Sequence, residues 1–190
     1  MFGALRARIG YLIARRLFHW SGLVKQPQAW RWMEGQFARM AALGDTQAQS
    51  FYGHILLFRG QGLGARNEGR RLLSLAAMAG DAKAAYQLGV LSLSGDAQQA
   101  ADAAKAVEWW TLAAQAGHPA AAYRLAELYR SGAAGVDADA VQAEHFAALS
   151  NRLSGLRSCL QVLPSSCRIR LGVDDMQAIA RHGLGMTLGL

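Results

Sequence analysis

Small and large apolar residues recur along the middle of the chain with a period of about 36 residues. Three stretches align: FARMAALGDTQAQSFYGH, LSLAAMAGDAKAAYQLGV and TLAAQAGHPAAAYRLAE. The glycines that they share, Gly44, Gly80 and Gly117, are 36 and 37 residues apart. A unit of this length accommodates two helices of about 12 residues and two short turns. The pattern therefore predicts tandem antiparallel helix pairs.

The residues around these glycines predict where helices end and begin. Glycine tolerates the left-handed conformation that often follows the last turn of a helix. The next residue is aspartate in two copies, Asp45 and Asp81, and an aspartate side chain caps the first turn of a helix well. The third copy has His118 there, followed by Pro119, which suits the first helical position.

Two further repeated positions predict how the helices pack. Gly53 and Gly89 fall inside predicted helices, where glycine costs about 1 kcal/mol relative to alanine, so a close approach of a neighbouring helix is expected there. Leu72, Trp109 and Phe146 form a recurring large position that we expect to fill the space between neighbouring pairs. Trp109-Trp110 could form a ligand-stacking site, but the repeat alignment favours Trp109 as a core residue.

The predicted helices follow from these signals. We expect an N-terminal helix at about 3–20, a capping helix at 27–43 and a short C-terminal helix at 174–182. Between them lie three pairs: 46–58 with 67–79, 82–93 with 103–116, and 119–130 with 139–152. The domain organisation is a basic arm over 1–26, repeats over 27–163 and a capping segment over 164–190. The repeats lie at about 45–80, 81–117 and 118–153, with a degenerate copy at 154–163.

The composition agrees with an all-α fold, and the distribution of charge along the chain limits the class of partner. Hydrophobic residues make up 52% of the chain, and there are only three prolines in 190 residues. Residues 1–33 hold six of the 20 basic residues and no acid, which leaves 14 basic and 13 acidic residues, a net charge of +1, over 34–190. A nucleic-acid-binding domain needs a basic stripe on its folded body. We therefore expect no nucleic-acid partner.

The basic arm has two interpretations. Its longest uncharged apolar stretch, Ile9 to Ala14, is shorter than a membrane span or a typical signal-peptide core, which predicts a cytoplasmic protein. With its apolar neighbours, the arm could bind an anionic inner membrane through residues 1–24 and the arginines Arg6, Arg8, Arg15 and Arg16. The alternative, which we favour, is a helix packed on the first repeat with its arginines reaching water.

The chain carries no motif for catalysis or metal binding. Its five histidines show no H-x-x-x-H spacing, and neither G-x-S-x-G nor S-x-x-K occurs. The glycine-rich stretch Gly60–Gly64 is interpreted as a turn rather than a phosphate site. Cys159 and Cys167 are interpreted as two thiols, with a disulfide as the alternative, and no further ligand suggests zinc. We expect this protein to have no enzymatic activity and to bind no cofactor or metal.

One known family matches these positions. Ala84-Ala85-Tyr86-Gln87-Leu88-Gly89, followed by Lys105-Ala106-Val107-Glu108-Trp109-Trp110 and Ala113-Ala114-Gln115-Ala116-Gly117, resembles the Sel-one-like repeat, a branch of the tetratricopeptide class. Gly132-Ala133-Ala134-Gly135-Val136 and Tyr129 add to the third copy. The resemblance covers roughly residues 36–153. It departs at Leu56 and Ser92, where the family has tyrosine, and at Gln36-Phe37. The repeats hold no cysteine, unlike the secreted, disulfide-bonded branch.

The resemblance implies a right-handed α-solenoid of about three helix pairs with atypical capping helices. In such solenoids the first helix of each pair lines a concave face that binds partners. The expected function is a bacterial, non-catalytic adaptor or scaffold that binds a protein or peptide. Alternatives are a membrane-peripheral component of an envelope assembly, tethered by the basic helix, and, less favoured, a hydrolase. The predicted binding residues, unless the tyrosines only complete helix packing, are Tyr86, Tyr123, His54, Glu127, Lys83 and Arg130.

Overall fold

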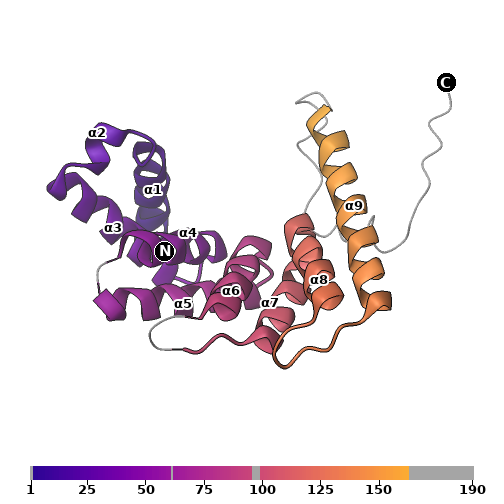
Figure 1. Cartoon of the computed structure of the whole chain (residues 1–190). Helices are drawn as coiled ribbons and strands as arrows, with labels where there is room; N and C mark the ends of the chain where they lie inside the picture. The colour runs from indigo at the N-terminus through magenta and orange to yellow at the C-terminus, as the bar shows by residue number, and fades with distance from the viewer. Residues whose placement is uncertain (1, 61, 96–98, 163–190) are drawn as a thin grey trace, which may run out of the picture. The chain divides into compact units, whose positions relative to one another are not determined.

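The computed structural model describes residues 2–60, 62–95 and 99–162, with side chains from residue 5 to residue 155. The chain divides into two compact units, Met1–Ala85 and Tyr86–Leu190. Within the described ranges every regular element is a helix, and the only bridge is the isolated pair Ala133 and Val136 (Figure 1).

Helices that follow one another in the chain pack together within each unit. The first unit contains α1 (Phe2–Leu17), α2 (Ser21–Val24), α3 (Pro27–Ala42), α4 (Thr46–Arg59) and α5 (Gly62–Met78). In it α1 packs on α3, α3 on α4 and α4 on α5. Helix α6 (Ala82–Ser94) continues from the first unit into the second, which adds α7 (Ala103–Gln115), α8 (Pro119–Ser131) and α9 (Ala140–Val162). There α7 packs on α8 and α8 on α9. The predicted all-α fold of helix pairs is confirmed.

The turns between pairs have the predicted geometry. Gly44, Gly80 and Gly117 have φ angles of 85°, 94° and 83°, in the left-handed region. The Asp45 carboxylate accepts a hydrogen bond from the Ala48 amide at 2.8 Å, and Asp81 accepts one from the Ala84 amide at 2.7 Å. In the third copy His118 occupies the cap position without a side-chain cap bond, and Pro119 begins α8.

The interior glycines lie where helices approach closely, as predicted. A Cβ on Gly53 would lie 2.9 Å from Leu73 Cγ and 3.0 Å from the Gly69 carbonyl oxygen, across the α4–α5 contact. A Cβ on Gly89 would overlap the indole of Trp110. Each glycine thus makes room for a large residue of the following helix.

That large residue is one position later than the sequence predicted. Trp110 is 2% exposed and its indole N–H donates to the Tyr86 carbonyl oxygen at 3.2 Å, whereas Trp109 is only half-buried. The prediction that Trp109 is the core tryptophan is therefore wrong. In the first copy Leu72, at the predicted position, and Leu73, which is equivalent to Trp110, are both buried. The register differs because Trp110, and not Trp109, lies on the side of α7 that meets α6.

Two helix boundaries and one short helix also differ from the prediction. Helix α5 begins at Gly62 instead of residue 67, so most of the stretch predicted as a turn is helical. Gly62 has a φ angle of 81°, in the left-handed region, so glycine suits the residue at which this helix begins. Helix α9 runs unbroken to Val162, through Gly155, so no separate fourth helix begins there. The short helix α2 was not predicted.

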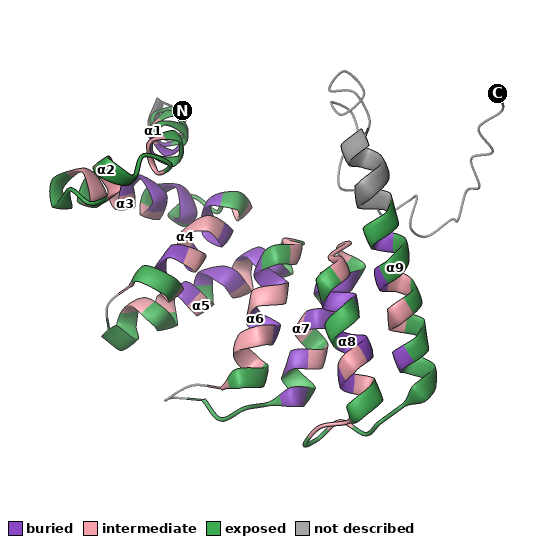
Figure 2. Ribbon diagram, turned by 45° about the horizontal axis from the view of Figure 1, so that its top comes forward, coloured by how far each residue is buried: buried purple, intermediate pink, exposed green. Residues whose placement is uncertain are grey.

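The N-terminal arm packs on α3, in agreement with the packing interpretation. One side of α1 is buried (Figure 2). It consists of Ala7, Tyr11 and Ala14, and the Tyr11 ring meets Phe37 edge-on with centroids 6.0 Å apart. A Cβ on Gly10 would overlap the end of the Gln36 side chain, so this side chain packs directly against the α1 backbone. Helix α1 packs mainly on the predicted capping helix, and its Arg15 also contacts Gln47 and Phe51 of the first repeat.

Some predictions fall outside the described residues. These are the C-terminal helix at 174–182, the capping segment 164–190 and the state of Cys167. Cys159 belongs to α9, but its side chain is also outside the described ones. The domain boundaries at residues 26 and 163 stay predictions.

Candidate interaction surface

Helix α8 presents a row of polar and aromatic side chains in the second unit. It buries Ala121, Leu125 and other small or apolar residues, and its opposite face is in water. Tyr123 is 53% exposed, and residues 123, 127 and 130 follow one another at helical spacing on one face. The Tyr123 hydroxyl donates to Glu127 Oε1 at 2.9 Å, and Arg124 Nη1 donates to Glu127 Oε2 at 3.3 Å.

Glu127 is the electrostatic centre of this row. Its hydrogen bond and negative charge raise the pKa of Tyr123, while the positive charges of Arg124 and Arg130 lower it by less. The phenol therefore stays protonated and donates to the carboxylate. Contact with the Tyr86 side chain raises the pKa of Arg124, and the Glu127 carboxylate adds to this effect. Arg124 thus links α8 to α6.

Tyr86 on α6 is partly engaged in packing. Its ring stacks on His118 with centroids 4.7 Å apart and planes 14° apart, and it is half-buried. Its carbonyl oxygen accepts the Trp110 indole bond. The alternative in which the tyrosines complete packing therefore describes Tyr86 but not the exposed Tyr123.

The structure brings together four of the six predicted binding residues. Tyr86, Tyr123, Glu127 and Arg130 belong to the second unit. His54 lies in the first unit, where Nδ1 donates to the Ser50 carbonyl oxygen at 2.7 Å and the ring stacks on Phe58. Lys83 lies exposed in the first turn of α6, also in the first unit.

Two members of the site were missed from the sequence. Arg124 precedes Glu127 by three residues, a spacing that indicates a pair on one helix face, so this signal was available. His118 was assigned only to the turn, and nothing local indicates that its ring lies against Tyr86. We call Tyr86, His118, Tyr123, Arg124, Glu127 and Arg130 the α6–α8 surface.

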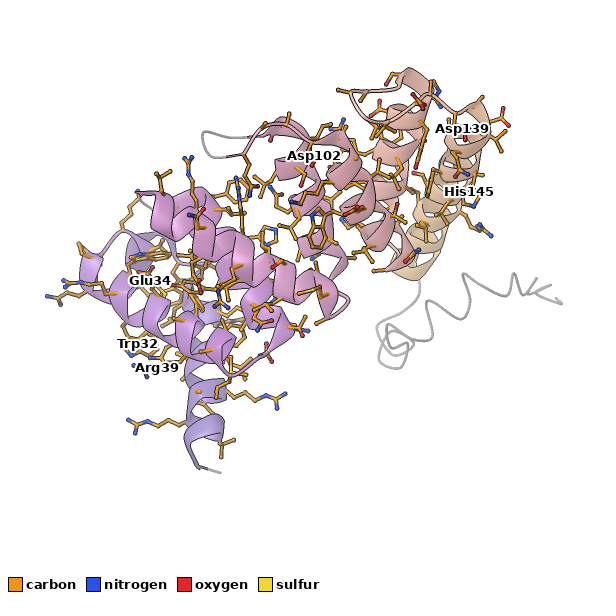
Figure 3. All side chains as sticks on the ribbon, turned by 90° about the horizontal axis from the view of Figure 1, so that it is seen from below. Trp32, Glu34, Arg39, Asp102, Asp139 and His145 are labelled. Carbon is orange, nitrogen blue, oxygen red and sulfur yellow. The ribbon has the colours of Figure 1, made fainter. Side chains whose placement is uncertain are left out.

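The described part of the chain offers little to support chemistry. No group of three His, Cys, Asp or Glu side chains that could hold a metal occurs among the described residues. A depression of about 440 Å³ lies between loops of the second unit and includes Asp102 and Lys105. Asp102 is already used there, since it accepts from the Lys105 amide at 2.9 Å and caps α7. Asp139 likewise caps α9, and both aspartates lie at helix starts in Figure 3.

Tandem helical hairpins with an exposed row of aromatic and charged side chains define a helical-repeat protein. The sequence model of the Sel1 repeat matches residues 46–81, 82–118 and 119–153, which is more than half of the chain. The chain belongs to the Sel1 repeat family. Sel1 repeats are commonly protein–protein interaction modules, and their fold is typically non-catalytic.

Solved structures are similar to this chain in fold. One is c5321, a protective antigen present in uropathogenic Escherichia coli strains that displays an SLR fold; it is 26% identical, with a TM-score of 0.57 over 74% of this chain. The match covers only 29% of c5321. Another is a Sel1 repeat protein from Oxalobacter formigenes, 29% identical, with a TM-score of 0.50 over 63% of this chain and 95% of that protein. No curated protein matches the sequence.

No helix among the described residues is both long and apolar enough to span a bilayer.

Proposed function

We propose that this protein is a non-catalytic adaptor or scaffold that binds a protein or peptide partner on the α6–α8 surface. The observation that carries the proposal is the exposed Tyr123, held by Glu127, whose carboxylate also pairs with Arg124. Tyrosine and arginine are enriched among the side chains that dominate binding energy at interfaces. A side chain that is already held loses less conformational freedom when a partner binds.

The charges of the α6–α8 surface suit a polar partner. Arg124 is paired with Glu127, but Arg130 has no ion pair among the described residues. A partner carboxylate can therefore pair with Arg130 while an apolar group packs on the Tyr123 ring.

His54 and Lys83 remain in the proposal as binding residues of the first helices, because His54 and Glu127 hold equivalent places in their repeats.

Alanine substitution tests the proposal in the intact chain. We expect the double variant Tyr123→Ala and Arg130→Ala to weaken partner binding by about 2 kcal/mol, roughly thirtyfold in Kd. Both side chains are exposed, so helix content should be unchanged. Leu112→Ala, 43% exposed on α7, is the matched control and should bind like the unchanged protein.

The measurement is affinity purification with the intact chain, followed by titration of each retained protein. Partners held equally by the unchanged chain and the folded double variant would contradict this surface. Partners lost with both variants would indicate a general defect and not a site.

A second candidate function is a membrane-peripheral component of an envelope assembly, at the cytoplasmic face of an inner membrane. One observation favours it: α1 turns its small side chains to α3 and its large apolar ones outward, beside arginines. Its test is whether the intact chain sediments with lipid vesicles.

A further inference from the structure

The outward side of α1 is unusually apolar for a surface helix. Leu5, Ile9, Leu12 and Ile13 are 59%, 50%, 58% and 47% exposed. Their spacing of four, three and one residues places them in a single stripe along the helix. The opposite side, which packs on α3, is built mainly from small residues and the Tyr11 ring. Helix α1 therefore has two apolar sides, of which one is covered.

Positive charge borders this stripe. Arg6, Arg8 and Arg16 are exposed, and none of them forms an ion pair within the described residues. At about 100° per residue, Arg16 falls within the stripe while Arg6 and Arg8 fall on its two edges. The first acidic residue of the chain is Glu34, so α1 and α2 carry no negative side chain.

Arg15 differs from the other three arginines. Its Nη1 lies 3.5 Å from Gln47 Oε1, and its guanidinium lies 5.6 Å from the centre of the Phe51 ring. It is thus turned toward α4 and helps to dock α1. The outer face of α1 is then defined as Leu5, Ile9, Leu12 and Ile13 with Arg6, Arg8 and Arg16.

We propose that the outer face of α1 binds the surface of an anionic phospholipid membrane while the opposite side of the helix stays docked on α3. The leucines and isoleucines enter the boundary between headgroups and acyl chains, and the arginines bind lipid phosphates. This inference rests on the second candidate function and names its site, its lipid class and its binding mode. Trp20, 66% exposed just after α1, is a residue type that favours the same interface.

Charge complementarity decides between the possible occupants. A second copy of this face would bring Arg6, Arg8 and Arg16 against their own equivalents, and like charges oppose such pairing. An anionic bilayer meets both properties of the face at once, because it offers phosphates above an apolar layer. An acidic protein partner is the remaining occupant and becomes an outcome of the test.

The experiment measures sedimentation of the full chain with phosphatidylcholine vesicles, with or without phosphatidylglycerol. One variant carries Ile9→Gln, Leu12→Gln and Ile13→Gln, and another carries Arg6→Gln, Arg8→Gln and Arg16→Gln. All six positions are exposed, so both variants should keep their helix content. The charge control removes three exposed basic groups elsewhere, with Arg39→Gln, Arg66→Gln and Lys105→Gln, and Arg39 lies on α3 (Figure 3). The apolar control is Leu63→Gln with Met78→Gln.

We expect the unchanged chain and both controls to bind phosphatidylglycerol vesicles, and to bind pure phosphatidylcholine at least about tenfold more weakly. The outer-face arginine variant should lose roughly a hundredfold in partitioning, since each arginine near an anionic surface contributes about fivefold. Binding of the unchanged chain should also fall as salt is raised. Hydrogen exchange of the α3 amides should not speed up on vesicles, because α1 stays docked.

Four results would overturn the inference or part of it. No binding to any vesicle removes it together with the second candidate function. Vesicle binding that is indifferent to anionic lipid or to the outer-face variants leaves that function standing and removes only this site. Faster exchange in α3 on vesicles shows that α1 leaves its docking place and removes the binding mode. Loss of an acidic protein from the outer-face variants, without vesicle binding, assigns the face to a protein.

Discussion

Replacing Gly89 with alanine would place a methyl group against the indole of Trp110. The new Cβ would lie 2.9 Å from Trp110 Cε2 and closer still to Cδ1 and Nε1. The indole has little room to move, because it is 2% exposed and its N–H is bonded to the Tyr86 carbonyl oxygen. Either the ring or the whole of α6 must shift.

Two opposing effects set the magnitude of this change. Alanine in place of glycine inside a helix stabilises it by about 1 kcal/mol. Overpacking a rigid core costs about 1–3 kcal/mol, and weakening the indole hydrogen bond costs about 1 kcal/mol more. We therefore expect Gly89→Ala to lower the free energy of unfolding by about 1–3 kcal/mol. The third copy avoids this conflict, since it has Ala126 at the glycine position and Ala147 at the tryptophan position.

Urea unfolding followed by circular dichroism measures the effect. The matched control is Gly35→Ala in α3, where a Cβ would meet no atom within 4 Å. We expect that variant to gain about 0.5–1 kcal/mol from helix propensity alone. Combining Gly89→Ala with Trp110→Leu should cost less than the sum of the two single changes, because the smaller side chain relieves the overlap.

A Gly89→Ala protein as stable as the unchanged chain would refute the close contact between α6 and α7. So would equal gains for Gly89→Ala and Gly35→Ala. Additive costs in the double variant would show that the destabilisation has another origin.

Two further predictions concern local interactions. Asp81→Ala removes the cap bond to the Ala84 amide and should destabilise the protein by about 1 kcal/mol, whereas Asp81→Asn should retain most of it; thermal unfolding checks both. Burial and the Glu34 carboxylate raise the pKa of Tyr52 to about 12 from 10.0. Because the pKa is raised in the folded state, the neutral phenol contributes stability that is fully present below pH 10 and is lost as the pH rises from 10 to 12. In Tyr52→Phe, the free energy of unfolding measured in urea should therefore change less over that pH range. An unchanged alkaline slope in Tyr52→Phe would contradict that assignment.

The repeated helix pairs and their turns could be predicted because they depend on neighbours in the chain. A glycine in the left-handed region and an aspartate that caps the next amide act over three or four residues, and Gly80 and Asp81 behave as their positions indicate. The position of Gly89 inside a helix also correctly predicted the close approach of a neighbouring helix. Family membership follows from the same regular spacing.

Choices of helix face depended on the tertiary structure. Trp109 and Trp110 are the same residue type, and their directions differ by about 100° around the α7 axis. Only the position of α6 decided which of the two rings is buried. The pattern of α1 contains apolar residues on both sides, and only the contact with α3 determined that Ala7 and Ala14 are covered while Leu5 and Leu12 are exposed.

The candidate site divides in the same way. Helical spacing alone placed Tyr123, Glu127 and Arg130 on one face of α8. The stack of Tyr86 on His118 joins residues 32 positions apart, and the chain contains no local signal for it. Local spacing therefore determined the elements and their ends, whereas contacts between distant residues determined which side chains remain available to a partner.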